Sequence, residues 1–293
     1  MKNKIEMMQE IKDLPVVIFN EIGYSYPNGT EALKDISLNI FKGELIGIMG
    51  KNGAGKTTLI RTLNGLIRPT YGSIYIENEN ISSKSIATLS KKVGIIFQNP
   101  FHQLFANSVE EEIRFSLKSL NLHKEEIQMR VDQVLQDFNL EKYRNRSPLN
   151  LSGGESKKLA LASIICRDPE ILVFDEPTLG QDAKEVEFFI NLIKKERNIG
   201  KTIIIITHNV EFAYDYLQRT ILMADGQIIC DGPTKKVLNN EFLIKKTSLI
   251  LPQIRQFNLA LQQTGYRDVE DVLTKNDMIN YLSNLIQHKS SNI

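Results

Sequence analysis

The chain of 293 residues has no tryptophan, only two cysteines and four histidines, and no long apolar stretch. Cys166 and Cys230 lie far apart and form no C-x-x-C pair, which argues against a disulfide framework and predicts reduced thiols. The longest apolar runs, such as residues 203–206, are far too short to cross a bilayer. Residues 1–6 lack the apolar core of a signal peptide. If the chain acts at a membrane, we expect it to dock onto another protein that crosses it.

Neither sign of charge predominates, because the chain has 36 lysines and arginines and 35 aspartates and glutamates. No run of like charges exceeds a Lys-Lys pair or a Glu-Glu-Glu cluster, so the sequence shows no nucleic-acid-binding surface. The hydrophobic share of 42% and the charged share of 24% are ordinary for a globular protein. The length allows one large domain, or a domain with an appendage.

Apolar periodicity divides the chain into regions. Residues 16–100 show short β-rich runs with turns and one helix, and residues 101–167 turn helical, beginning with a capping box at residues 108–111. Strand–helix alternation returns over residues 170–231, where β-branched runs indicate a buried parallel sheet. Residues 234–293 are predicted to form a small helical C-terminal extension.

Residues 50–57 match the phosphate-binding loop pattern G-x-x-x-x-G-K-[ST] between a strand-like run and a helical one. A chance glycine-rich turn is the alternative, but average composition gives only on the order of 0.01 such matches per chain. The glycines allow consecutive N–H groups to surround phosphate oxygens at a helix start. Lys56 is expected to reach the β- and γ-phosphates, and the Thr57 hydroxyl to complete a Mg²⁺ shell. The predicted nucleotide contacts are Gly50, Lys51, Asn52, Gly53, Ala54, Gly55, Lys56, Thr57 and Thr58.

Two carboxylates, Asp175 and Glu176, directly follow the apolar run at residues 171–174. An acid at such a strand end holds Mg²⁺ in phosphate-loop proteins, so Asp175 is predicted to be the metal residue. Glu176 is placed to orient or deprotonate an attacking water. A solvated Asp-Glu turn is the alternative, and the phosphate loop in the same chain argues against it.

Four further residues are candidates by position. Gln98 follows the apolar run at residues 93–97 and could bond a Mg²⁺-bound water, although a surface-loop glutamine would look the same. His208 follows another strand-like run, where ligand sites of open α/β sheets lie, and its imidazole could donate to a γ-phosphate. Tyr24 and Tyr26 alternate on one face of a strand-like run and could stack on adenine, although half-buried strand tyrosines explain the pattern equally.

The pentad Leu-Ser-Gly-Gly-Glu at residues 151–155 precedes a long helical stretch. Ser152, Gly153 and Gly154 expose N–H and hydroxyl donors at a helix start, which makes a second anion-binding device. A simple helix cap explains Ser-Gly but not the whole pentad.

In this order the motifs resemble those of the nucleotide-binding subunits of ABC transporters, over residues 16–232. The resemblance implies an α/β fold with a P-loop (RecA-like) ABC ATPase core, an antiparallel β subdomain, an inserted helical subdomain at about residues 101–167 and a small C-terminal helical extension. The ATPase domain would cover residues 16–233, and residues 234–293 would be a dimerisation segment. Implied motif residues are Tyr26 (A-loop), Gln98 (Q-loop), Ser152, Gly153, Gly154 and Glu155 (signature), Asp182 (D-loop) and His208 (H-loop).

Some less specific segments resemble the energy-coupling factor (ECF) ATPases of vitamin and transition-metal importers. These segments are residues 97–100 with 103–105, residues 146–148 and residues 251–254. The family implies two ATPase subunits, identical or different, that sandwich ATP and Mg²⁺ between the phosphate loop of one chain and the signature of the other. Further implied partners are a transmembrane scaffold subunit and a substrate-binding membrane subunit, with no nucleic acid. The chain would then lie on the cytoplasmic face of the cell membrane as a peripheral protein.

Glu155 stands where the family usually has glutamine. A carboxylate in the first turn suits the helix dipole by roughly 0.3–1 kcal/mol, yet it could oppose a γ-phosphate. The D-loop reads Gln-Asp-Ala around Asp182 where Leu-Asp-Pro is common. Alternatives are an ATPase of another importer or an exporter with a C-terminal regulatory segment, a catalytically weak partner in a heterodimer, and a non-transport ABC protein acting on DNA or ribosomes. The single phosphate loop and the absence of a basic patch argue against the last.

Overall fold

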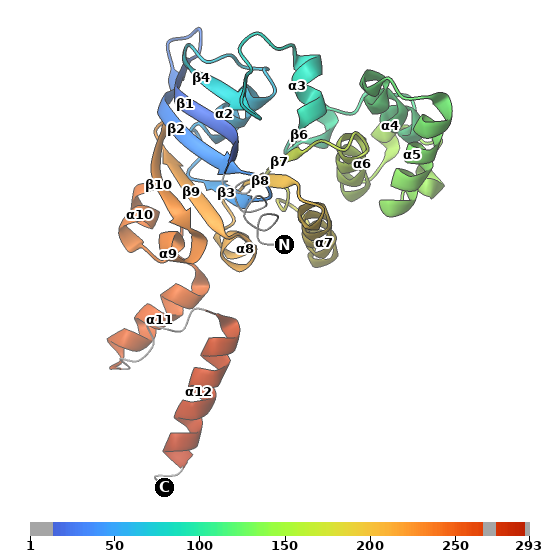
Figure 1. The fold of residues 1–293 in the computed structure, drawn as a ribbon. Helices are drawn as coiled ribbons and strands as arrows, with labels where there is room; N and C mark the ends of the chain where they lie inside the picture. Colours follow the sequence, from blue (N-terminus) through green and yellow to red (C-terminus); the bar gives the residue numbers. More distant parts are fainter. Residues whose placement is uncertain (1–13, 266–273, 291–293) are drawn as a thin grey trace, which may run out of the picture.

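The computed structural model describes residues 14–265 and 274–290, which form two β-sheets, a group of helices beside them and a projecting C-terminal pair of helices (Figure 1). The larger sheet has six strands in the order β10-β9-β3-β8-β7-β6. All neighbours in it are parallel except β10, which pairs antiparallel with β9. The strands are β3 (Leu45–Met49), β6 (Val93–Ile96), β7 (Ile171–Asp175), β8 (Thr202–Ile206), β9 (Arg219–Ala224) and β10 (Gln227–Pro233).

Every residue of β3, β6, β7 and β8 is buried, as expected for a parallel sheet covered on both faces. Alternate residues enter different cores, because successive side chains of a strand point to opposite faces. Leu172 and Phe174 pack with the helical group, whereas Ile171 and Val173 pack with the smaller sheet. The sequence prediction of a buried parallel sheet is therefore confirmed.

The smaller sheet is antiparallel, in the order β2-β1-β4-β5, and covers one face of the larger sheet together with α2 (Lys56–Leu63). Arg219 of β9 joins the two sheets, because its guanidinium donates to the Glu44 and Asp231 carboxylates and to the carbonyl of Asn39. The strands are β1 (Pro15–Ser25), β2 (Glu31–Phe41), β4 (Tyr71–Ile76) and β5 (Glu79–Asn80).

The first region contains a second helix, α3 (Ile86–Lys92), where the sequence analysis predicted only one. Its seven residues are too few to show a clear apolar periodicity. The local signal was the N-cap: the Ser85 side chain accepts a hydrogen bond from the N–H of Thr88.

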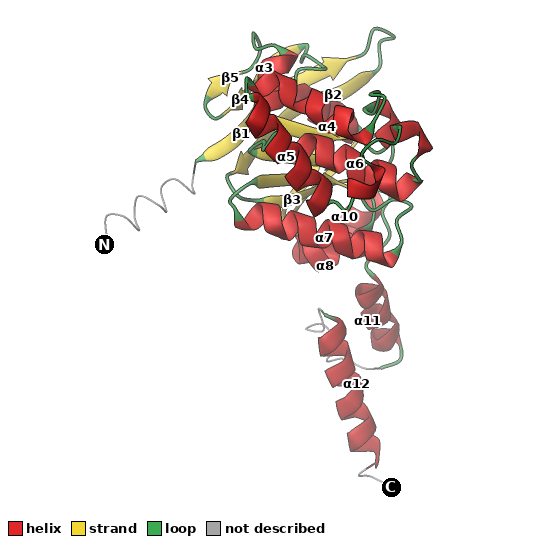
Figure 2. Cartoon of the chain, turned by 90° about the vertical axis from the view of Figure 1, so that its right-hand side faces the viewer, coloured by secondary structure: helices red, strands yellow, loops and turns green. Residues whose placement is uncertain are grey.

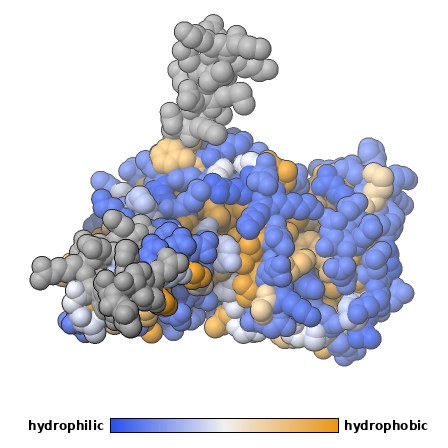
Figure 3. All heavy atoms as spheres, turned by 90° about the horizontal axis from the view of Figure 1, so that it is seen from below, coloured by the Kyte–Doolittle hydropathy of each residue, from blue (hydrophilic) through white to orange (hydrophobic). Residues whose placement is uncertain are grey.

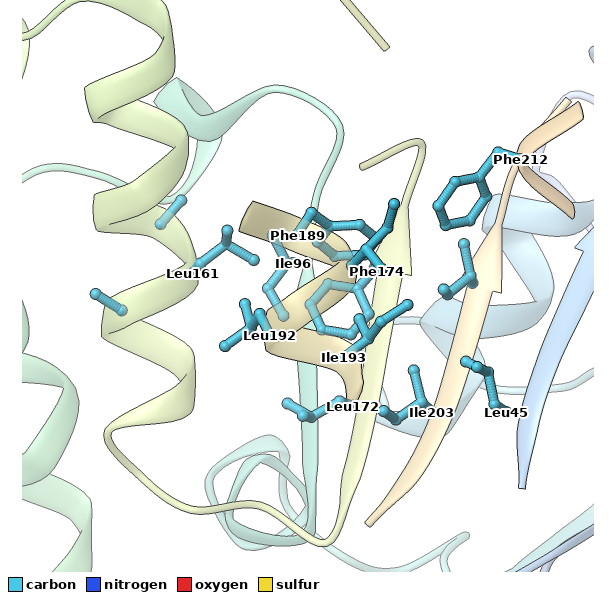
Figure 4. Close-up of a cluster of buried hydrophobic side chains, with 14 of the residues drawn as sticks. Leu45, Ile96, Leu161, Leu172, Phe174, Phe189, Leu192, Ile193, Ile203 and Phe212 are labelled. Atoms are coloured by element: carbon cyan, nitrogen blue, oxygen red, sulfur yellow. The ribbon is translucent and has the colours of Figure 1, made fainter. Parts of the chain in front are cut away.

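The helical region contains α4 (Val109–Leu117), α5 (Lys124–Asp137) and α6 (Gly153–Ile165), which lie together at one side of the sheets (Figures 1 and 2). Ser108 accepts a hydrogen bond from the N–H of Glu111 and so caps α4, but as an ordinary N-cap rather than the reciprocal capping box that the sequence predicted. The group packs against β6, β7 and α7 (Ala183–Asn198) through Ile96, Leu161, Phe174 and Phe189 (Figure 4).

The C-terminal helices fall into two sets. The helices α9 (Thr234–Leu238) and α10 (Glu241–Lys246) contribute Val237, Leu238 and Ile244 to the core that also contains α8 (Val210–Tyr216). The helices α11 (Gln253–Gln263) and α12 (Lys275–Ser290) project from the body (Figures 1 and 2). Within the described residues, none of the helices combines the length and the hydrophobicity that crossing a bilayer requires. Both cysteines are free, in agreement with the sequence prediction.

Candidate nucleotide-binding site

The loop between β3 and α2 has the backbone of a phosphate cradle. Gly55, with φ of 98°, is the N-cap of α2. Gly50 has φ of 146°, and a Cβ there would lie 2.1 Å from the carbonyl oxygen of Met223. Any larger residue at position 50 would therefore clash with backbone that cannot move away. The helix begins at Lys56, so its first N–H groups face the loop.

Lys56 holds the loop in shape from inside. Its ammonium donates to the carbonyl oxygens of Gly50 at 2.7 Å and Lys51 at 2.9 Å. Burial lowers the pKa of Lys56, while the nearby carboxylates of Glu176 and Asp175 oppose that shift. The loop thus contains a buried cation that is compensated by carbonyl dipoles and by the acids at the end of β7.

Asp175 ends β7 and is only 7% exposed. Its Oδ2 atom accepts a hydrogen bond of 3.1 Å from the Thr57 hydroxyl. Burial raises the pKa of Asp175, and the Thr57 hydrogen bond and the Lys56 charge only partly counteract this. A buried carboxylate beside a hydroxyl is the oxygen donor set that Mg²⁺ prefers, so these two residues fit the predicted metal role. The described residues contain no cluster of three His, Cys, Asp or Glu side chains, so further oxygens would have to come from the nucleotide and water.

Glu176 and His208 meet at the ends of adjacent strands β7 and β8. Glu176 has a left-handed φ of 51°, and its N–H donates to the carbonyl of Ile206 at 2.9 Å. The Glu176 Oε1 atom lies 2.7 Å from Nδ1 of His208. Because the carboxylate can only accept, Nδ1 carries the hydrogen and Nε2 is left free to act elsewhere.

Tyr26, just after β1, and Gln98, just after β6, line the same cleft. Tyr26 lies beyond the end of β1, in a turn closed by the Gly29 N–H, so it is not the strand residue that the tyrosine alternation predicted. Its hydroxyl lies 3.0 Å from that of Thr58, and its ring meets Tyr24 edge to face at 5.0 Å. Gln98 is exposed and follows β6, as expected.

One cleft therefore collects the residues that the sequence predicted to bind phosphate and metal and to act on water. It is lined by Tyr26, Asn52, Gly53, Ala54, Gly55, Lys56, Thr57, Thr58, Gln98, Asp175, Glu176 and His208. Gly50 and Lys51 support its floor through their bonds to Lys56.

The signature residues and Asp182 do not line this cleft. Ser152 and Glu155 form a reciprocal capping box at the start of α6: the Ser152 N–H donates to the Glu155 carboxylate at 2.8 Å, and the Glu155 N–H donates to the Ser152 hydroxyl at 3.3 Å. Hydrogen bonds from Tyr143 and from the Ser152 backbone lower the pKa of Glu155. The glutamate at this position thus has a local structural role as a cap.

Asp182 forms the matching capping box of α7 with Glu185. The two caps touch, because a Cβ on Gly154 would lie 1.9 Å from Oε1 of Glu185. The turn at residues 152–155 and the turn at Asp182 are therefore held side by side.

The chain matches the ABC transporter family over residues 33–179. The energy-coupling factor transporter ATP-binding protein EcfA of Methanocaldococcus jannaschii is 36% identical, over 91% of this chain and 98% of its own length. EcfA of Methanothermobacter thermautotrophicus is 34% identical, over 92% of this chain and 88% of its own length.

The chain belongs to the ABC transporter family.

Other relatives are longer. An ABC transporter ATP-binding protein of Methanosarcina acetivorans is 40% identical over 92% of this chain but only 44% of its own length. The chain spans less than half the length of this relative and of a second one from Methanosarcina mazei, matched over 43% of its length.

Solved structures agree with the ABC fold. The structure of cbiO1 from Clostridium perfringens, part of the ABC transporter complex cbiONQ, has a TM-score of 0.70 and 35% identity, over 86% of this chain and 97% of that one. A dimeric ATP-binding cassette in a post-hydrolysis state, bound to ADP and Pi, has a TM-score of 0.68 and 29% identity, over 74% of this chain and 98% of that one. The predicted fold class, an α/β ABC ATPase core, is confirmed.

The sequence analysis missed cleft residues that only the fold brings there. Glu31 and Ala32 of β2 and Leu179 also line the cleft. The hairpin turn between β9 and β10 supports the loop from below, since Lys51 pairs with Asp225 at 2.9 Å. An alternating strand and a short turn carry no signal of their own for such a role. Leu179 stands three residues before Asp182, so the resemblance to the D-loop at Asp182 could have indicated it.

Proposed function

We propose that the chain is the ATP-binding and ATP-hydrolysing subunit of an ECF-type ABC importer of vitamins or transition-metal ions. The observation that carries the proposal is the single cleft in which the phosphate loop, Asp175, Glu176 and His208 converge. The relatives named EcfA, which the chain covers almost completely, and the structural likeness to cbiO1 support the ECF type.

In this proposal the loop N–H groups and Lys56 bind the ATP phosphates, and Tyr26 offers its ring to the adenine. Mg²⁺, held by Thr57 and Asp175 with Gln98 near its water shell, would supply charge neutralisation on the phosphates. Glu176 accepts the proton of the attacking water. His208 keeps the Glu176 carboxylate oriented through Nδ1, and its Nε2 would be available to the γ-phosphate.

We further propose that a second ATPase subunit closes the cleft. Ser152 and Gly153 are exposed and lie outside this chain's own cleft, so their donors are available to an ATP molecule bound by another chain. The dimeric cassette with ADP and Pi shows that a similar protein pairs. The extension at residues 234–293 would stabilise the pair. A transmembrane scaffold subunit and a substrate-binding membrane subunit would place the chain at the cytoplasmic face of the cell membrane.

Co-purification of the intact complex, followed by ATPase assay and identification of its membrane subunits, tests the proposal. We expect Mg²⁺-dependent ATP hydrolysis, and a scaffold plus a small substrate-binding membrane protein among the partners. Membrane partners of an exporter, or of an importer fed by a soluble binding protein, would contradict the ECF type and leave the ATPase assignment. A purified complex that hydrolyses no ATP would contradict the ATPase assignment itself.

A further inference from the structure

The segment that leaves the cleft after Gln98 is tied to the helical group by the side-chain amide of Gln103. The Oε1 atom of Gln103 accepts the N–H of Phe97 at 3.3 Å, and its Nε2 atom donates to the carbonyl of Ala160 at 3.0 Å. Phe97 directly follows β6, and Ala160 lies in the middle of α6, 1% exposed. One amide therefore joins the end of a sheet strand to the helix that begins at Ser152.

A second tie holds the far end of the same segment. The carboxylate of Glu112 in α4 is buried, at 2% exposure. Its Oε2 atom accepts the N–H groups of Phe105 and Ala106, each at 2.8 Å. Two backbone N–H groups thus share one buried carboxyl oxygen, which attaches this end of the segment to the helical group. The segment is therefore tied to α6 through Gln103 and to α4 through Glu112.

Phe97 also contacts the helix that carries the phosphate loop. The guanidinium of Arg61 lies 5.7 Å from the centre of the Phe97 ring. Arg61 is four residues after Thr57 on α2, and hence on the same face one turn later. Its Nε atom is buried and makes no hydrogen bond within the part of the chain that the structure describes. Phe97 thus lies where the nucleotide-binding helix and the helical group meet, and it lines an apolar hollow together with Ile96, Leu161 and Phe188. Apolar residues are also visible among the mostly hydrophilic surface on the face of the molecule seen from below (Figure 3).

The geometry gives the amide of Gln103 a mechanical consequence. Ala160 is eight residues after Ser152, roughly 12 Å along one continuous helix. A displacement at the end of β6 would therefore reach the turn at Ser152 through the Gln103 amide and α6.

We propose that Gln103 is a positioning residue that couples Gln98, in the nucleotide cleft, to the signature turn at the start of α6. The proposal rests on the ATP-dependent function proposed above and adds a residue that touches neither nucleotide nor metal.

Two substitutions separate the halves of the amide. Gln103→Leu removes both hydrogen bonds, whereas Gln103→Glu keeps an acceptor for the Phe97 N–H but at pH 7.5 has no hydrogen to donate to Ala160. Gln136→Leu, an exposed glutamine of α5, is the matched control. For both Gln103 variants we expect a fluorescent ATP analogue to bind within about twofold of wild type, while kcat falls roughly 3–30-fold because one or two hydrogen bonds are lost. The control should match wild type in both.

Hydrogen exchange tests the coupling without relying on turnover. In wild type and in Gln136→Leu, Mg²⁺ and ATP should slow exchange both in the peptide at residues 97–103 and in the peptide at residues 151–158. In Gln103→Leu and Gln103→Glu, only the first peptide should respond. Equal responses of both peptides in every variant would overturn the proposal, as would kcat, ATP affinity and melting temperature falling together. Loss of ATP hydrolysis in wild type would instead contradict the proposed function, and the exchange pattern would still decide the role of Gln103.

Discussion

Nδ1 of His208 lies 2.7 Å from Oε1 of Glu176, and the backbone N–H of His208 lies 3.4 Å from the other carboxylate oxygen. Both contacts go to the carboxylate of Glu176, a residue whose backbone has a left-handed conformation. His208 and Glu176 therefore form one unit across the ends of β7 and β8, rather than two separate catalytic candidates.

The first prediction concerns the proton acceptor. Glu176→Gln should lower ATP hydrolysis roughly 10²–10⁴-fold, because an amide cannot take the proton of the attacking water. ATP binding should be unchanged, since the glutamine still accepts the His208 hydrogen bond and the phosphate loop is untouched. Turnover at saturating ATP and affinity for a fluorescent ATP analogue check the two parts. Glu187→Gln, on the exposed face of α7, is the matched control and should behave as wild type. Unchanged turnover in Glu176→Gln would remove Glu176 from the mechanism.

The second prediction follows from the shared hydrogen bond. His208→Ala should lower kcat roughly 10²–10³-fold, the loss expected for one preorganised donor. Residues that act as a unit give non-additive effects, so adding His208→Ala to Glu176→Gln should cost little more. The kcat values of wild type, both single variants and the double variant test this, with His123→Ala as an exposed-histidine control. A double variant whose loss equals the product of the single losses would show that the residues act separately.

Much of the site could be predicted because its residues are consecutive in sequence. The phosphate loop carries its own strand, glycines and helix start, and Asp175 and Glu176 follow a strand that is recognisable alone. Parallel strands bring their carboxyl ends to one edge, so the meeting of Glu176 and His208 also follows from the pattern. These predictions needed no knowledge of long-range contacts beyond the sheet itself.

What the sequence could not predict are contacts set by side-chain packing. The amide of Gln103 reaches an α6 carbonyl 57 residues away, which no local periodicity reports. The sequence shows only the charge of Glu155, whereas the structure shows that its carboxylate accepts the Ser152 N–H. The alternation predicts that Tyr26 lies on a strand, because alternation does not show where a strand ends. Each of these depends on geometry between elements or on a boundary of one or two residues.

The third prediction uses the raised pKa of Asp175. Because burial raises the pKa of Asp175, the folded protein favours the neutral carboxyl group over the carboxylate. The stability that the neutral group contributes is fully present below the unfolded-state pKa and is lost as pH rises through the raised folded-state pKa. Asp175→Asn should therefore stabilise the nucleotide-free protein at pH 8, by on the order of 1 kcal/mol. The gain should shrink as pH falls toward the ordinary carboxyl range. Urea denaturation at pH 8, and at the lowest pH where both proteins stay folded, measures this.

Asp137→Asn is the opposite-sign control for that experiment. Burial tends to raise the pKa of Asp137, but its hydrogen bonds, the one from Lys195 among them, and the Lys195 charge together outweigh this, and the pKa is lowered overall. The ionised form therefore stabilises the folded protein, and Asp137→Asn should destabilise it at pH 8.

With Mg²⁺ and ATP at 100 times Kd, wild type should gain about 2.7 kcal/mol of stability, and Asp175→Asn should lose most of that gain. A destabilised Asp175→Asn protein at pH 8 without nucleotide would contradict the electrostatic argument.

The fourth prediction separates two neighbouring glycines of the signature turn. A Cβ on Gly154 would lie 1.9 Å from Oε1 of Glu185, whereas a Cβ on Gly153 meets nothing within 4 Å. Gly153→Ala should stabilise the protein by roughly 0.4–1 kcal/mol, since alanine loses less chain entropy on folding. Gly154→Ala should destabilise it by roughly 0.5–2 kcal/mol, because Glu185 must leave the capping box that it forms with Asp182. Adding Glu185→Ala to Gly154→Ala should then cost little further, because the cap is already broken. Urea denaturation of the three variants tests this, and equal effects of the two single alanines would show that the turns at Gly154 and Asp182 do not constrain each other.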